Sequence, residues 1–502
     1  MKQNQNRESG KRRGVNLASS RKAGGRNFLT SDTKIAEDER RRRWLAASGL
    51  NLLVAALLVG VLWDGGYFPS GKWTFSLLML AAAALEVTLS GRGRYRLPVC
   101  FWPLAALAGL AAASVLWSVA PGDTWREIVV LAALLAAAFT AGSELRRPGV
   151  LELLAAWLAY CGAFAAGWGI ITYLLRMAPY SGVADGVMRA GSTFGYANAL
   201  SCFSLMALPV TGALLRGAPR RQRPLLTLAI SLETAAVILT FARFGYIILP
   251  VVAAVFIVTG FRRGDAGTFA VAVAAGLAVA VVAALGESYD RPFAGLAAVI
   301  GLLTAGWLSQ MAAGGGFGHR RTAKAATLAF GLPAALAVLA AASLRHLAWQ
   351  RFVRGLGPGS LLPHRLQTFA GALAAIRQHL LFGSGLGTFA VSYQLYAEAG
   401  YSKFAHNLVL QFAVDLGLNG GILMAALLLL AALAAARRLV TDAGALPRAF
   451  AAAALVFIAY NLFDWEWYFP ALAGWFVVAV AAASVPERDR KRHRGVRQGT
   501  GL

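Results

Sequence analysis

Apolar runs of membrane-spanning length recur along most of this sequence. They are rich in Leu, Ala and Val, and 58% of the 502 residues are hydrophobic while only 14% are charged. About 20 apolar residues in a helix cross a hydrocarbon layer about 30 Å thick. Backbone groups inside that layer must bond to one another, which restricts spanning structures to helices and closed barrels. Because the runs lack the alternating pattern of barrel strands, we predict an all-α integral membrane protein.

We count about fourteen transmembrane helices, within a range of 12–14. The predicted spans are 44–62, 73–90, 98–117, 127–142, 150–174, 195–215, 225–242, 244–260, 267–286, 292–312, 324–344, 406–436, 448–463 and 469–485. The predicted regions are a disordered basic tail over 1–43, helices 1–11 within 44–344, a large outward loop over 345–405, helices 12–14 within 406–485, and a basic tail over 486–502.

Basic residues concentrate in alternate connections between the predicted spans. GRGRYR (91–96) and RGAPRRQR (216–223) are strongly basic, whereas GESYDRP and DWEWYFP are not. Because cytoplasmic loops carry an excess of Lys and Arg, this alternation predicts an even number of spans with both termini in the cytoplasm. The same rule, together with anionic membrane lipid, explains the net charge of +25 without nucleic acid as a partner.

Residues 345–405 are the longest polar break between predicted spans, and the topology places them outside. Within this loop, LQTFAGALAAIRQHL (366–380) has an apolar face at helical spacing but is too short to cross a bilayer. We therefore expect an amphipathic helix along the outer membrane surface. GSGLGTF (383–389) predicts a glycine-rich turn after it.

Positive charges on the outward side run against the orientation rule and become candidate functional residues. They are Arg189, Arg243, Arg345, Arg351, Arg354, Arg365, Arg377, His364, His379 and His406. Arg243 stands between two spans with almost no connection, at a depth where a charge is costly. The alternative is an arginine that snorkels to the interface. Arg189 precedes a predicted helix start, and the free N–H groups of a helix start can bind an anion such as diphosphate. The alternative is that Arg189 is an exposed charge beside a helix cap.

His406 opens a predicted helix at the outer boundary, where an imidazole can act as a general base or simply as a cap. Asp464 and Glu466 in FDWEWYF could bind a cation, but the flanking Trp and Tyr residues favour an interfacial aromatic belt. We find no outward constellation with convincing metal-ligand spacing and no Walker or G-x-S-x-G motif. An outward cluster of positive charge points to an anionic, partly lipidic ligand.

Three stretches resemble the O-antigen ligase / O-antigen polymerase family of bacterial membrane proteins. They are VLWSVAPGDTWRE, MRAGSTFGYANALSCFSLMALP, and HRLQTFAGALAAIRQHLLFGSGLGTF followed by AHNLVLQFAVDLGLNGG. The likeness covers roughly residues 100–440, with Asp415 where the family usually has Glu. It implies a GT-C-like fold and a metal-independent glycosyltransferase without a cofactor.

The resemblance also implies substrates and residue roles. The donor would be a glycan on an undecaprenyl-diphosphate carrier, and the acceptor a glycan, lipid or protein at the outer face of the plasma membrane. Carried over by motif, Arg189 and Arg243 would hold the diphosphate, with Arg365 assisting, and His406 would activate the acceptor hydroxyl. Two other functions remain open: a flippase or transporter of lipid-linked glycan, which would show related halves and a charged central cavity, and a structural partner in envelope assembly.

Overall fold

The computed structural model describes residues 49–89, 97–184, 186–260, 263–313, 361–397, 400–441 and 444–484. The two predicted basic tails lie outside these ranges. So do the predicted span 324–344 and the first part of the predicted outward loop, 345–360.

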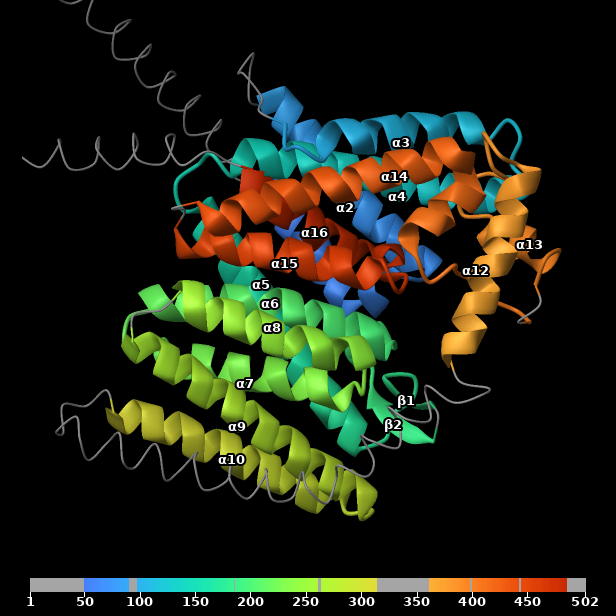
Figure 1. Cartoon of the computed structure of the whole chain (residues 1–502). Helices are drawn as coiled ribbons and strands as arrows, with labels where there is room; N and C mark the ends of the chain where they lie inside the picture. The colour runs from blue at the N-terminus through green and yellow to red at the C-terminus, as the bar shows by residue number, and fades with distance from the viewer. Residues whose placement is uncertain are drawn as a thin grey trace, which may run out of the picture.

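Helices account for most of the described residues (Figure 1). Their bounds are Gly49–Leu62, α2 Pro69–Leu89, α3 Phe101–Ser114, α4 Pro121–Glu144, α5 Val150–Leu174, α6 Ala197–Gly217, α7 Arg223–Leu239, α8 Arg243–Gly260, α9 Arg263–Ser288, α10 Pro292–Ala313, α12 Leu361–Gln378, α13 Phe389–Gln394, α14 Leu408–Val440, α15 Ala445–Asn461 and α16 Pro470–Ser484. Short 3₁₀ turns are η1 Asp64–Gly66, η2 Ser192–Phe194 and η3 Glu466–Tyr468.

Each predicted span that falls within the described ranges overlaps one of these helices. Five helices in the described part of the chain are long and apolar enough to cross a membrane: α4, α5, α6, α14 and the Gly267–Ser288 part of α9. A helical, membrane-embedded protein is therefore supported by length and composition. The number of about fourteen spans stays a prediction.

The prediction of an all-α chain is wrong in one place. Strands β1 Ser181–Ala184 and β2 Val187–Ala190 pair antiparallel, with Ser181 opposite Ala190. The two residues between the strands are Asp-Gly, the dipeptide preferred in tight hairpin turns, and Gly186 has φ +72°. The segment between α5 and α6 forms no helix here, so its backbone N–H and carbonyl groups pair between the two strands instead.

The helices form two groups that meet along α6 and α15 (Figure 1). One contains α2–α4 with α14–α16, and the other contains α5–α10. The β1–β2 hairpin lies at the same end of the bundle as α12 and α13, and α12 runs across the ends of the long helices (Figure 1). Segments from both groups are thereby brought together at one end.

Helix α12 confirms the helix expected over 366–380, although it starts earlier, at Leu361. Ala372, Ala375 and Ile376 on one face pack with α13 and α14, in a small apolar cluster separate from the main core. The opposite face leaves Leu366 and Leu373 exposed. Its location on a membrane surface stays a prediction.

The glycine-rich turn after α12 pairs with a break in α14. At Gly417 the helix is interrupted, with φ +71° and ψ −172°. The Leu418 N–H donates to the Leu380 carbonyl at 2.8 Å, and the carbonyl of Asp415 accepts from the Gly385 N–H at 2.8 Å. Buried backbone groups must be paired, so the broken helical turn and the glycine-rich turn complete each other.

We predict that alanine at this junction destabilises the fold. A Cβ on Gly383 would lie 2.4 Å from the Asp415 backbone, and one on Gly417 2.2 Å from the Leu381 backbone; both glycines have positive φ. Gly383→Ala or Gly417→Ala should cost about 1–3 kcal/mol in overpacking alone. Thermal unfolding in detergent measures the loss. Gly109→Ala, in α3 with nothing within 4 Å of its Cβ, is the control and should leave the midpoint unchanged or higher.

Candidate functional site

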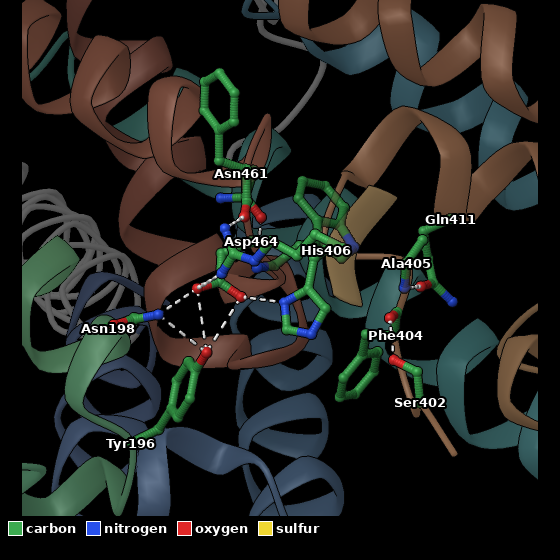
Figure 2. Close-up of polar contacts among 12 residues, drawn as sticks. Tyr196, Asn198, Ser402, Phe404, Ala405, His406, Gln411, Asn461 and Asp464 are labelled. Atoms are coloured by element: carbon green, nitrogen blue, oxygen red, sulfur yellow. Dashed lines mark hydrogen bonds and ion pairs between the residues drawn. The ribbon is translucent and has the colours of Figure 1, made fainter. Parts of the chain in front are cut away.

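A single buried carboxylate, Asp464, collects polar side chains from distant parts of the chain (Figure 2). It lies between α15 and η3. His406 Nδ1 is 2.8 Å from Asp464 Oδ1, and the Tyr196 hydroxyl donates to both carboxylate oxygens at 3.1–3.2 Å. The Asn198 amide also donates to Oδ2. Arg365 Nη2 completes the group at 3.6 Å from Oδ2. Residues from the starts of α6, α12 and α14 thus meet at one point.

His406 is held in place by the residues that start α14. The helix begins at Leu408, two residues later than predicted, because Asn407 is its N-cap: the Asn407 Oδ1 accepts from the Leu410 N–H at 2.9 Å. The Asn407 amide also donates to the Leu462 carbonyl at 2.9 Å. His406 itself has φ +51°, an uncommon conformation for a residue with a side chain. The two hydrogen bonds of Asn407 fix the imidazole next to Asp464.

The loop that carries Asp464 is ordered by Asn461. The Asn461 Oδ1 accepts from the Trp467 N–H at 2.8 Å, and its amide donates to the Phe457 carbonyl at 2.9 Å. Asn461 is fully buried. A satisfied buried amide of this kind restrains the backbone on both sides of Asp464.

Two of the predicted arginines are bound to this cluster. Arg189, on β2, donates from Nη2 to Asn198 Oδ1 at 2.6 Å and from Nε to the Thr240 carbonyl at 2.7 Å. Arg365, on α12, donates from Nη1 to the Phe463 carbonyl at 2.8 Å. Arg189 therefore reaches Asp464 through Asn198, whereas Arg365 stands directly beside the carboxylate.

Arg243 lies close to both of these attachments. It is half-buried at the start of α8, three residues after Thr240, whose carbonyl binds Arg189. The ring of the next residue, Phe244, packs 5.2 Å from the ring of Phe463, whose carbonyl binds Arg365. The three predicted arginines consequently border one region.

Other predicted cations do not join the cluster. Arg377 and His379 are exposed at the end of α12. His364 belongs to α12, but its side chain lies outside the described part, as do Arg345, Arg351 and Arg354.

The two acidic groups of the loop differ in charge state. Burial alone would raise the pKa of Asp464, but His406, Arg365 and Asn198 hold that pKa below its usual value. Glu466 is fully buried, and no other residue in the described ranges makes a hydrogen bond to its carboxyl group. Burial, and then the neighbouring charge of Asp464, raise the pKa of Glu466 well above its ordinary value. These opposite shifts favour the ionised form of Asp464 and the neutral form of Glu466.

This assignment leaves the region positively charged. Arg189, Arg243 and Arg365 contribute three positive charges and Asp464 one negative charge, giving 3 − 1 = +2 for these four groups. In the neutral imidazole, Nδ1–H donates to Asp464 and the Nε2 lone pair is available to accept a proton. His406 keeps 22% of its side-chain surface exposed. The arrangement can hold an anion and remove a proton from a group beside it.

The predicted interfacial belt at FDWEWYF is wrong for Trp467 and Tyr468, which are buried inside the protein, whereas Phe463 is 52% exposed. Trp467 and Tyr468 are 4% and 5% exposed. Trp465 stacks on Phe404 with ring centroids 4.4 Å apart and packs on Tyr196 at 4.5 Å. These rings form a wall beside Asp464 instead of meeting lipid headgroups.

Asp464 was missed as a site residue by the sequence reasoning. It lies 58 residues from His406 in the chain, and its aromatic neighbours favoured another interpretation. The available signal was a carboxylate in an apolar setting beside an outward histidine, since buried charges need a partner.

No protein-family model matches the chain, and no curated protein matches it either.

We predict opposite effects of two amide substitutions in the loop. Because the pKa of Asp464 is lowered in the folded protein, its ionised carboxylate stabilises the fold at pH values above about 3.9. That stabilisation is lost as the pH falls through the pKa of Asp464 in the folded protein. A raised pKa means that Glu466 costs stability as pH rises above about 4.3. Asp464→Asn should therefore lower stability by about 1–3 kcal/mol at both pH 5 and pH 8. Glu466→Gln should raise the unfolding temperature above that of wild type, and by more at pH 8 than at pH 5. Equal shifts for the two variants would contradict the charge assignment.

Proposed function

We propose that this protein transfers a glycan from an undecaprenyl-diphosphate carrier to an acceptor hydroxyl at the outer face of the plasma membrane. The observation that carries the proposal is the His406–Asp464 hydrogen bond within a region of net positive charge. An imidazole oriented by a carboxylate is suited to general-base chemistry. An anion site beside it suits a phosphorylated donor.

The arginines would stabilise the leaving group. Diphosphate departs with the electron pair of the bond to the anomeric carbon, so its negative charge grows during the reaction. Arg365 and the neighbouring Arg189 and Arg243 would meet that charge with hydrogen-bond donors that cannot lose their proton. The attachment of Arg189 and Arg365 to backbone carbonyls holds them in place before substrate arrives.

His406 would activate the acceptor. Its Nε2 takes the proton from the acceptor hydroxyl while that oxygen forms a bond to the anomeric carbon and the carbon–diphosphate bond breaks. The products are a new glycosidic bond, undecaprenyl diphosphate and a protonated imidazole. Direct displacement predicts inversion at the anomeric carbon. Asp464 keeps Nδ1 protonated and stabilises the imidazolium that forms.

A complementation experiment tests the proposal. Cells lacking the protein are given the wild-type protein, His406→Ala or His379→Ala. Wild type should consume the pool of undecaprenyl-diphosphate-linked glycan and restore finished surface glycan. His406→Ala should lower transfer by about 10²- to 10⁴-fold, the usual contribution of a general base, and leave donor accumulating on the outer leaflet. His379→Ala changes an exposed histidine outside the cluster and should complement fully.

Two results would contradict the proposal. Full complementation by His406→Ala would exclude that imidazole as the base. Accumulation of the glycan on the inner leaflet in cells lacking the protein would instead indicate a flippase.

A second prediction separates donor binding from the base. Arg365→Met should raise the KM for the lipid-linked donor by about 10- to 150-fold, the loss of one hydrogen bond from a charged group. Arg377→Met removes an exposed arginine from the same helix and serves as the matched control. Initial rates over a range of donor concentrations measure the effect. An equal KM for the two variants would remove Arg365 from the donor site.

A further inference from the structure

A second polar group borders the aromatic wall and includes one of its rings, Tyr468. It consists of Lys72 at the start of α2, Glu127 in the first part of α4, Lys403, and the tyrosines Tyr67 and Tyr468. Lys72 and Glu127 form an ion pair, and their side chains are 13% and 16% exposed. The Lys72 Nζ also lies 5.9 Å from the centroid of the Tyr468 ring. Neither charge takes part in the proposed transfer chemistry at His406.

Lys403 and Tyr67 extend this group toward the surface. Lys403 is exposed, its Nζ donates to the Tyr67 hydroxyl at 2.6 Å, and it lies 4.7 Å from the centroid of the Tyr67 ring. The exposed ring of Phe68 packs edge-on against Tyr67. Tyr67 is half-buried, so one part of its side chain remains accessible.

A continuous series of ring contacts connects this group with Asp464. Tyr196, which donates to Asp464, packs on Trp465; Trp465 stacks on Phe404; and Phe404 packs on Tyr468 at 4.6 Å. The two groups are also close along the chain, because Lys403 contacts Tyr67 and His406, three residues later, contacts Asp464. Three residues of chain span at most about 10 Å. One bound oligosaccharide could therefore contact both groups.

The two polar groups differ in the ligand they suit. The group that contains the arginines carries excess positive charge and fits a diphosphate. In the second group, Lys72 and Glu127 cancel each other's charge and combine ammonium donors with carboxylate acceptors. Sugar hydroxyls are both donors and acceptors, so such a mixed pair fits a neutral, hydroxyl-rich ligand better than an anion.

We infer that Lys72, Glu127, Lys403, Tyr67 and Tyr468 form the acceptor subsite, which binds the hydroxyl-rich sugar whose hydroxyl attacks the donor. This inference rests on the proposed function, because it assigns the second substrate of that reaction. It assigns the acceptor to the group around Lys72 and Glu127, and the diphosphate to the arginines.

Binding of two probes to the purified full chain in detergent tests the inference. One probe is the free neutral oligosaccharide released by mild acid from the accumulated carrier-linked glycan. The other is farnesyl diphosphate, a short anionic analogue of the carrier. Saturation-transfer NMR follows both in the same sample. Lys72→Met and Glu127→Gln should weaken oligosaccharide binding at least about tenfold and leave farnesyl diphosphate within about twofold.

Two further variants guard against simple loss of folding. Lys403→Met alters an exposed residue that no helix packing requires, and it should also weaken oligosaccharide binding. Arg176→Met is the matched control, because it breaks an ion pair with Glu287 between the end of α5 and α9, away from the wall. It should change the binding of neither probe.

The results separate this inference from the proposed function. Failure of the oligosaccharide to bind wild type, its unchanged binding to all three variants, or equal weakening of both probes would each overturn the acceptor subsite. Selective loss of oligosaccharide binding together with full complementation by His406→Ala would retain a glycan-binding site and refute the transfer chemistry at His406.

Discussion

One buried carboxylate organises the end of this helical bundle. Asp464 has little access to water, so its charge requires partners from the protein. Those partners come from the start of α6, from α12 and from the residue pair that precedes α14. The same contacts therefore bring together both helix groups and place His406 against a carboxylate. Structure and candidate chemistry depend on the same interaction.

The surroundings of Asp464 would give the proposed anion binding and the proposed proton transfer different physical bases. Backbone carbonyls of Thr240 and Phe463 fix two of the arginines, so positive charge is held in place before a ligand arrives. The aromatic rings packed around Trp465 give the region near His406 an apolar boundary, and low polarity strengthens electrostatic interactions. Burial disfavours the charged form of Glu466, which limits competing negative charge. The proposed anion binding can thus coexist with an imidazole that accepts a proton.

Much of the helical architecture could be predicted from sequence, because apolar runs carry a strong and local signal. The glycine-rich turn at 383–389 and the proximity of Arg189, Arg365 and His406 to one another also agree with expectation. The β1–β2 hairpin was missed despite its Asp-Gly turn, because strands of four residues leave only a weak pattern beside the long apolar runs. Asp464 was missed because its partner is 58 residues away, and pairing at that separation depends on tertiary packing.

Transfer and transport are separated most directly in proteoliposomes that contain the purified full chain, undecaprenyl-diphosphate-linked glycan and membrane extract as the source of acceptor. The measurement is the number of undecaprenyl diphosphate molecules released for each new glycosidic bond, with the anomeric configuration of that bond read by NMR. We predict one released carrier for each bond, with inversion. Movement of intact lipid-linked glycan between leaflets without release of carrier would contradict it.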